Sequence, residues 1–165
     1  MPVSATQLRQ LMGNFATGCT VVAMAADPPH GLTANAFTSV SIDPPLILVC
    51  VDHETESYEI LSEGDVERFC INILAREQRD LAEHFAGMDE IDDNPFEARV
   101  SSDIDAGAPV FEENLAYLDC TTYESHEAGD HTIYLGEVVN GDALRADAEP
   151  LTFYQGGWGT IDLDE

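Results

Sequence analysis

Short apolar runs separated by turn residues recur along most of this chain. Three such runs are rich in β-branched and aromatic side chains and alternate with Gly, Pro and Asp clusters, which is typical of strands; they are residues 19–26, 46–52 and 69–74. Residues 115–128 and 131–146 predict two longer antiparallel strands joined at Gly129-Asp130. Many strands at short intervals predict a mainly β protein with flanking helices, and favour a closed barrel over a doubly wound sheet.

Two segments have helical spacing instead. Residues 4–12 place apolar side chains on one face between a serine cap and a glycine, which predicts a short helix. Residues 76–87 place Leu81 and Phe85 on one side and also end on a glycine, which predicts a second helix. Residues 88–114 are acidic and weakly periodic, and predict a long surface excursion with few regular elements.

Length and composition change this picture little. At 165 residues, 44 % of them hydrophobic, the chain is long enough for one domain with its own core, and we expect a single domain over residues 1–165. The sequence contains no apolar stretch of the length that crosses a bilayer, and its start has no basic segment followed by an apolar one. We therefore expect a cytoplasmic protein without a signal peptide or membrane span.

Charge is the most unusual property of the composition. The sequence has 32 acidic residues against 6 basic ones, a formal net charge of −26, and every basic residue is an arginine. The acids are spread along the whole chain, so they do not form an interaction tail. Molar salt would screen their mutual repulsion, which predicts a halophilic protein. The same charge argues against nucleic acid or an anionic membrane as partner.

Most familiar catalytic motifs are missing. There is no GxSxG, HExxH, GxGxxG or Walker loop, and the five histidines show no paired metal-ligand spacing, so we expect no metal site. The four cysteines lie singly in apolar runs and predict small buried side chains instead of a disulfide framework; they are Cys19, Cys50, Cys70 and Cys120.

One polar stretch remains to be explained. Residues 31–41, GLTANAFTSVS, are mostly small and hydroxylated, although they directly precede the apolar strand at 46–50. They could form an edge strand whose Thr and Ser side chains face water. They could also form the wall of a ligand pocket, in which the Asn35 amide would contact the edge of a planar heterocycle.

The residues that carry a family resemblance lie in order along nearly the whole chain, from about residue 8 to 159. They are NFATGCTVVA (14–23), GLTANAFTSVSIDPPLILVCVD (31–52), FCINILAREQRDLAEHFAG (69–87), GDHTIYLGEV (129–138) and PLTFYQGGWG (150–159). In order and spacing the chain resembles the flavin reductase family, NAD(P)H-dependent enzymes that supply two-component monooxygenases. The TANAFTSVS and GDHT motifs are specific as a pair, whereas either alone would be weak.

The resemblance implies an FMN-binding split barrel of the antiparallel Greek-key type, usually a homodimer, that reduces FMN or FAD with NADH or NADPH. Carried over by position, the wall along the isoalloxazine and ribityl chain would comprise Thr33, Ala34, Asn35, Ala36, Ser39, Val40 and Ser41. The phosphate would lie in the turn 52–57, at Asp52, His53, Thr55 and Ser57. The site would be closed by Phe85, Ala86, Gly87 and, in the C-terminal segment that also holds Tyr154, by Trp158. His131 would lie on the nicotinamide side of the flavin.

The expected phosphate turn departs from the family, because members often have a basic residue there and this chain has Glu54 and Glu56. One interpretation is that Thr55, Ser57 and the backbone N–H groups at the start of a helix bind the phosphate, while the carboxylates face salt-screened solvent. The other is that the site binds flavin weakly, as a substrate that comes and goes.

His131 also has two interpretations. Its ring could cap the turn of a hairpin, or it could donate a hydrogen bond that orients the nicotinamide. Hydride transfer between nicotinamide and flavin depends on stacking at close distance and needs no side-chain proton shuttle in its main step. We therefore expect a flavin reductase. The alternatives are an FMN-binding electron-transfer protein that keeps its flavin bound, and a domain that retains the fold without the ligand.

Overall fold

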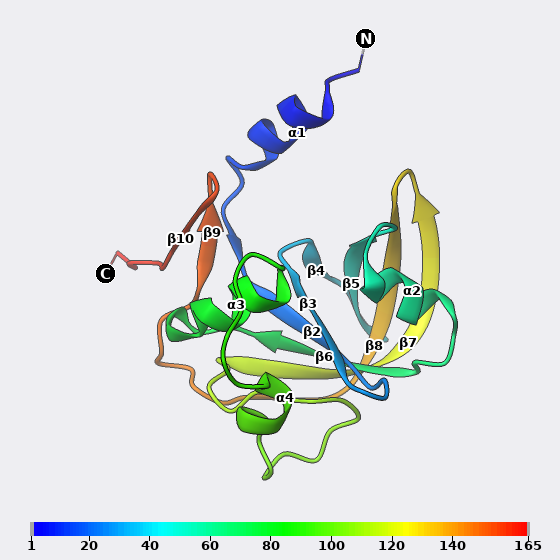
Figure 1. Cartoon of the computed structure of the whole chain (residues 1–165), viewed down its shortest axis with the longest axis vertical. Coiled ribbons are helices and arrows are strands. Elements are labelled where there is room, and N and C mark those ends of the chain that lie inside the picture. Colours follow the sequence, from blue (N-terminus) through cyan, green and yellow to red (C-terminus); the bar gives the residue numbers. More distant parts are fainter. Residues whose placement is uncertain (1, 165) are drawn as a thin grey trace.

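A seven-stranded antiparallel sheet forms the centre of the molecule in the computed structural model, which describes residues 2–164 (Figure 1). The strand order is β3-β2-β6-β7-β8-β5-β4. The strands are β2 (Thr20–Met24), β3 (His30–Ala34), β4 (Phe37–Ile42), β5 (Pro45–Asp52), β6 (Arg68–Ile73), β7 (Ala116–Ala128) and β8 (His131–Ala143). The predicted mainly β, antiparallel fold class is confirmed, and the five strands expected from the sequence correspond to β2, β5, β6, β7 and β8.

The two longest strands form a hairpin where the sequence predicts one. Ala128 pairs with His131 across Gly129 and Asp130, and Gly129 has a φ of 63°, which glycine adopts without a steric penalty. β8 also pairs with β5, so that His131 lies opposite Asp52. The hairpin therefore places the GDH motif beside the end of β5.

The sheet closes into a barrel at a seam between its two edge strands. β3 and β4 lie at opposite edges of the sheet, yet only Asn35 and Ala36 separate them in sequence. The two edges must therefore meet at this linker, where the amide of Cys50 donates a hydrogen bond of 3.0 Å to the carbonyl of Ala36. Farther along, helix α2 (Glu56–Ser62) contacts both β3 and β5 and covers the gap between them. The barrel is split at this place.

The two largest of three apolar clusters hold the barrel together. The first fills the interior between the strands with alternate side chains such as Val22, Val49, Phe69 and Ile71, all buried. The second lies between the sheet and α3 (Arg79–Phe85), and consists of Cys19, Val21, Leu74, Leu81, Ala82, Phe111 and Leu151. The predicted helix at 76–87 is confirmed for α3, but residues Arg76–Gln78 form a 3-10 turn, η1.

The prediction that residues 88–114 form a surface excursion is only half right. The segment has one short helix, α4 (Pro95–Ala98), but Val110, Phe111 and Asn114 are buried. Asn72 in β6 explains this burial, since its Oδ1 accepts hydrogen bonds from the Phe111 amide at 3.0 Å and from Asn114 Nδ2 at 2.6 Å. Gln78 Nε2 in turn donates to Asn114 Oδ1 at 3.1 Å. A network of buried amides thus pins the end of the segment to the barrel.

A second, smaller sheet joins the two ends of the described chain. Its order is β1-β9-β10, with β1 (Thr17–Gly18), β9 (Thr152–Tyr154) and β10 (Gly157–Gly159). The predicted N-terminal helix is confirmed as α1 (Ala5–Met12), capped by Ser4. It has no buried residue and projects away from the barrel (Figure 1). Between residues 2 and 164, no helix is both long and apolar enough to span a bilayer.

Candidate functional site

Two adjoining pockets open on either side of the β3–β4 linker, and they have Asn35 and Cys19 in common. The larger has a volume of about 460 Å³ and is lined by residues 15–20 together with Ala34, Asn35, Phe37, Thr38 and Ile73. The smaller has a volume of about 170 Å³ and is lined by Cys19, Thr33, Asn35, Ala86, Met88, Phe153 and Trp158. Four predicted site residues from three distant segments, Thr33, Asn35, Ala86 and Trp158, therefore meet at the small pocket.

Asn35 and Thr38 are the exposed polar residues among those that line these pockets, and only Asn35 lines both. The neighbouring hydroxyls serve the fold, because Thr33 Oγ1 donates to the carbonyl of Ala82 at 2.6 Å and Thr20 Oγ1 donates to the carbonyl of Ala34 at 2.7 Å. The Asn35 side chain is exposed, and its amide can both donate and accept. Thr17 Oγ1, in a residue that lines the larger pocket, is buried without a hydrogen-bond partner. The pockets thus combine mostly apolar walls with the exposed Asn35 amide, which is free to meet a heterocycle.

Cys19 contributes packing and not reactivity. Burial raises the pKa of its thiol to about 12, so the side chain stays protonated at neutral pH. A protonated thiol is a poor nucleophile, and the residue acts as part of the apolar wall.

Phe85 is held over β3 by close packing on a glycine. A Cβ atom added at Gly31 would lie 2.6 Å from Phe85 Cε1, so only glycine leaves room for the ring. Ala86 and Gly87 follow directly, and Gly87 has a φ of 71°, which ends the helix. This contact fixes the position of the 85–87 segment beside the small pocket.

We expect Gly31→Ala to destabilise the protein by about 1–3 kcal/mol, because the added methyl group displaces the Phe85 ring. The free energy of unfolding, measured by denaturant titration in molar KCl, checks this. Gly18→Ala is the matched control, since a Cβ there meets no atom within 4 Å. Equal stability of the two variants would contradict the packing argument.

The remaining part of the predicted wall lies farther along the seam. Ser39, Val40 and Ser41 belong to the edge strand β4, where the register shifts between Ser39 and Ser41, and they line neither pocket. Val40 is 46 % exposed. Their role at a ligand stays a prediction.

The predicted phosphate turn connects β5 to α2. Thr55 caps α2, accepting a hydrogen bond of 3.2 Å from the Tyr58 amide. His53 Nε2 lies 2.8 Å from Thr132 Oγ1, and the His53 ring packs on the Tyr58 ring at 4.4 Å between centroids, with the two planes tilted by 36°. Ser57 is buried, with its Oγ 2.9 Å from His30 Nε2. Two histidines, His30 and His53, thus form hydrogen bonds at this turn.

His131 lies at this turn and lines neither of the pockets around Asn35. It pairs with Asp52 across the sheet, and its Nδ1 lies 2.7 Å from Asp130 Oδ1. That hydrogen bond lowers the pKa of the Asp130 carboxyl. Asp52, His53 and His131 thus form a second group of predicted site residues.

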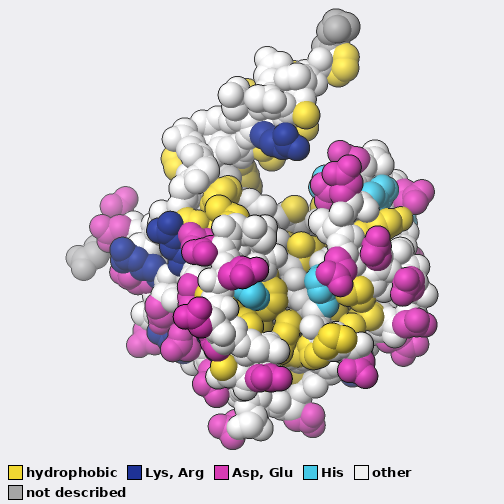
Figure 2. Space-filling view, viewed as in Figure 1, with side chains coloured by type: hydrophobic (Ala, Val, Ile, Leu, Met, Phe, Trp, Pro, Cys, Tyr) yellow, Lys and Arg dark blue, Asp and Glu magenta, His cyan; other side chains and the backbone are white. Residues whose placement is uncertain are grey.

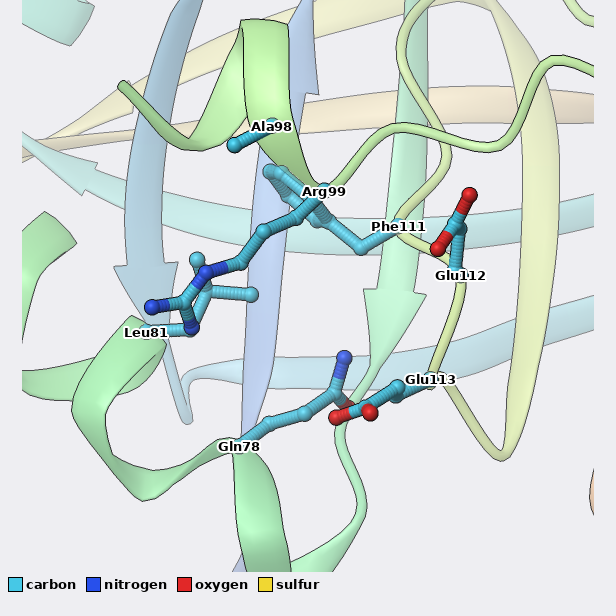
Figure 3. A pocket seen from close by; sticks show the side chains of 7 residues that line it. All are labelled: Gln78, Leu81, Ala98, Arg99, Phe111, Glu112 and Glu113. Carbon is cyan, nitrogen blue, oxygen red and sulfur yellow. The ribbon is translucent and has the colours of Figure 1, made fainter. Parts of the chain in front are cut away.

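A further pocket, of about 260 Å³, lies between the start of α3, α4 and residues 111–113 (Figure 3). None of the predicted site residues lines it. Arg99 at this pocket already pairs with Asp80 at 2.8 Å and with Asp93 at 3.2 Å, so its charge is compensated. We therefore place the candidate site at Asn35.

Sequence reasoning missed several residues that line the Asn35 pockets. They are Phe15, Ala16, Thr17, Gly18, Cys19 and Thr20, and from other segments Ile73, Met88 and Phe153. Phe153 pairs with Thr17 in the small sheet, and its ring packs on Trp158 at 5.0 Å between centroids. Residues 15–20 lie within NFATGCTVVA, one of the stretches that resemble the family, and this resemblance could have marked them as site residues. No local pattern links them to Phe153.

Comparison with known proteins decides the family. The profile described as "Flavin reductase like domain" matches residues 12–162, which includes both groups of site residues. The chain belongs to the flavin reductase family.

Members of the flavin reductase family with similar sequences include an NADH-dependent flavin reductase of a Rhodococcus species, 39 % identical over 165 residues, with 98 % of this chain and 89 % of that protein covered. The reductase subunit HsaB of a flavin-dependent monooxygenase from Mycobacterium tuberculosis is 32 % identical over 159 residues, covering 95 % and 82 %. Among solved structures, the NADH:FAD oxidoreductase SgcE6 of Streptomyces globisporus, in complex with NAD and FAD fragments, has a TM-score of 0.83 at 36 % identity, covering 96 % and 93 %.

Proposed function

We propose that this chain is a flavin reductase that transfers a hydride from NADH to a flavin. The proposal rests on family membership together with one structural observation, the convergence of Thr33, Asn35, Ala86 and Trp158 at adjoining pockets on the barrel seam. Apolar walls with few polar groups suit a flat, largely apolar ring system. The relatives named NADH-dependent flavin reductase and NADH:FAD oxidoreductase support the same activity.

The residues of this chain bind and orient. The nicotinamide and the flavin supply the redox chemistry between them, so the protein needs no acid or base in the main step. Asn35 fixes the heterocycle edge through its amide, and Phe153 and Trp158 cover the small pocket and exclude water. Asp52, His53, Thr55 and Ser57 form the turn for the flavin phosphate, and His131 beside it orients the nicotinamide nucleotide.

Charge supports NADH over NADPH and a salt-rich cytoplasm. Among the described residues, five of the six arginines pair with carboxylates; the pairs are Arg68–Asp119, Arg76–Glu149, Arg79–Glu83, Arg99–Asp80 and Arg145–Glu77. A 2′-phosphate would add two negative charges to a substrate of a protein that carries −26. Acidic side chains are scattered over most of the visible surface (Figure 2), which suits a halophilic protein.

The direct test is NADH oxidation in molar KCl with and without added FMN or FAD. Purified protein that is colourless and oxidises NADH only when flavin is added would establish a flavin reductase that uses flavin as substrate. Protein that stays yellow on dialysis and does not reduce added flavin would establish the alternative, an electron-transfer protein with bound FMN. Protein that neither binds flavin nor oxidises NADH would overturn both.

We expect His131→Ala to lower turnover with NADH by about tenfold and to change the Kd for flavin by less than threefold, because an orienting hydrogen bond to the nicotinamide is lost. Steady-state kinetics and flavin titration check the two values separately. His126→Ala on the same hairpin is the control, since the His126 ring is exposed and hydrogen-bonds to Glu124. Similar turnover in both variants would mean that His131 merely caps the hairpin.

The surface of α1 supports the proposal of a homodimer. Leu8, Leu11, Met12 and nearby Phe15 are 50–68 % exposed on a projecting helix, and burying them against a second copy would give a homodimer. Analytical ultracentrifugation in molar KCl tests this.

We further propose that residues 1–165 act as one domain and that the reduced flavin is passed to a monooxygenase, as the name of HsaB indicates for that protein.

A further inference from the structure

Met88 lies at the small pocket and is held there by the end of α3. Gly87 ends the helix with a φ of 71°, and its amide donates to the carbonyl of His84 at 3.1 Å. The Met88 amide donates to the carbonyl of Glu83 at 2.9 Å. These two hydrogen bonds form a Schellman motif, which fixes the backbone of Met88. The residue is 64 % exposed and lines the pocket together with Trp158, so its sulfur side chain is fixed beside the pocket yet open to solvent.

The end of the helix does not account for a methionine at this position. In a Schellman motif the residue after the glycine commonly makes a hydrophobic contact with the residue whose carbonyl its amide binds. That residue is Glu83, and its carboxylate pairs with Arg79 at 2.8 Å instead. The apolar side chain of Met88 therefore contributes to the pocket wall and not to the helix end.

Met88 is the sulfur side chain best placed for oxidation at this site. Oxidation of a thioether follows its exposure, whereas a thiol reacts with peroxide as its thiolate. Met24 is fully buried, and Met12, 58 % exposed, lies on α1 and lines neither Asn35 pocket. Burial raises the pKa of all four thiols, to about 12 in three of them, so they stay protonated at neutral pH; the four are Cys19, Cys50, Cys70 and Cys120.

We propose that Met88 is a site of reversible oxidation to methionine sulfoxide, through which peroxide weakens binding at the small pocket. The sulfur lone pair attacks one oxygen of the peroxide, so that an S–O bond forms, the O–O bond breaks and the second oxygen leaves with both protons as water. The sulfur loses two electrons and the peroxide gains them. Because the sulfoxide is polar and the pocket wall also contains Phe153 and Trp158, the oxidised side chain disfavours a flat, largely apolar ring.

The oxidant is a product of the proposed function, and this part of the inference rests on that function. Reduced flavin that no monooxygenase consumes passes two electrons and two protons to dioxygen, which yields oxidised flavin and hydrogen peroxide. Oxidation of Met88 then slows the reductase when its product is not used. A methionine sulfoxide reductase reverses the modification.

The test treats the purified protein with hydrogen peroxide in molar KCl and maps the products by peptide mass spectrometry. We expect sulfoxide at Met88 and not at Met24, and a Kd for FMN raised about tenfold. Met88→Leu keeps an apolar side chain without sulfur, so its Kd after treatment should stay within about twofold of its own untreated value. Met12→Leu is the matched control and should lose FMN affinity like the wild type. Methionine sulfoxide reductases for both epimers, but not dithiothreitol, should restore that affinity.

Trp158 provides a second readout that needs no flavin. It is the only tryptophan of the sequence and lines the same pocket as Met88. We expect its emission to shift to longer wavelength when the wild type and Met12→Leu are oxidised, and to stay unchanged in Met88→Leu.

An unoxidised Met88 would overturn the proposal, as would an oxidised Met88 without any change in the Kd for FMN. The same conclusion would follow if Met88→Leu and the wild type responded equally to peroxide. Untreated wild type that bound no flavin would overturn the proposed function instead, and the Trp158 emission would still decide whether oxidation of Met88 alters the pocket.

Discussion

Replacing Asn35 with alanine is expected to raise the Kd for flavin roughly 10- to 100-fold, because the isoalloxazine edge loses its amide partner inside a mostly apolar pocket. The fold should hardly change, since the Asn35 side chain is exposed and β3, the strand before it, is fixed by hydrogen bonds of Thr20 and Thr33. A melting temperature within about 2 °C of the wild type would confirm this. Fluorescence titration with FMN in molar KCl gives the Kd.

Asn140→Ala provides the matched control, because Asn140 is an exposed asparagine on β8 outside both Asn35 pockets. Asn35→Asp is a second informative variant, since it keeps the shape and removes the amide donor. We expect it to bind flavin at least as weakly as the alanine variant. The Asn140→Ala control should bind flavin like the wild type. If Asn35→Ala and Asn35→Asp also did so, the pockets at the seam would not be the flavin site.

Lowering the salt concentration should have the largest effect on stability. We expect the melting temperature to fall by at least about 10 °C between 2 M and 0.1 M KCl, because the Debye length grows from below 3 Å to about 10 Å and the repulsion among 32 acidic residues is restored. The arginine ion pairs work in the opposite direction, since low salt strengthens them. Most of them are partly exposed and contribute little each, so repulsion should dominate.

Differential scanning calorimetry across a KCl series checks this expectation. A screening effect should level off near 1 M, where the Debye length is already short, and sucrose at equal osmolality should not reproduce it. A melting temperature that rises as salt is removed would show that the ion pairs outweigh the repulsion, and the halophilic interpretation would then be wrong.

The sequence predicted those parts of the fold that local pattern determines. The β-branched run at 46–52 and the glycine at position 129 specify β5 and the β7–β8 hairpin through neighbouring residues alone. The burial of Phe111 could not be predicted in this way. It depends on Asn72, which is 39 positions away in the chain and accepts the Phe111 amide. In a sequence, a buried asparagine and an exposed one have the same appearance.

The candidate site, too, could be predicted where it depends on a local pattern and not where it depends on residues distant in the chain. The stretch 31–41 was recognised as a possible ligand wall, and Thr33, Ala34 and Asn35 do line the seam pockets. The pairing of Thr17 with Phe153, which brings Trp158 to Cys19, joins the two ends of the chain and leaves no periodic signal in either. Only the order of family-like segments hinted that both ends belong to one site.

The short linker between β3 and β4 links ligand binding to the integrity of the barrel. Asn35 and Ala36 connect β3 and β4, the two edge strands of the sheet, which do not pair with each other. A flavin bound to Asn35 would stabilise this seam, because separation of β3 and β4 would also break the hydrogen bond between the Asn35 amide and the flavin. Flavin should then protect the protein against unfolding by mass action, so that the substrate is also a folding ligand.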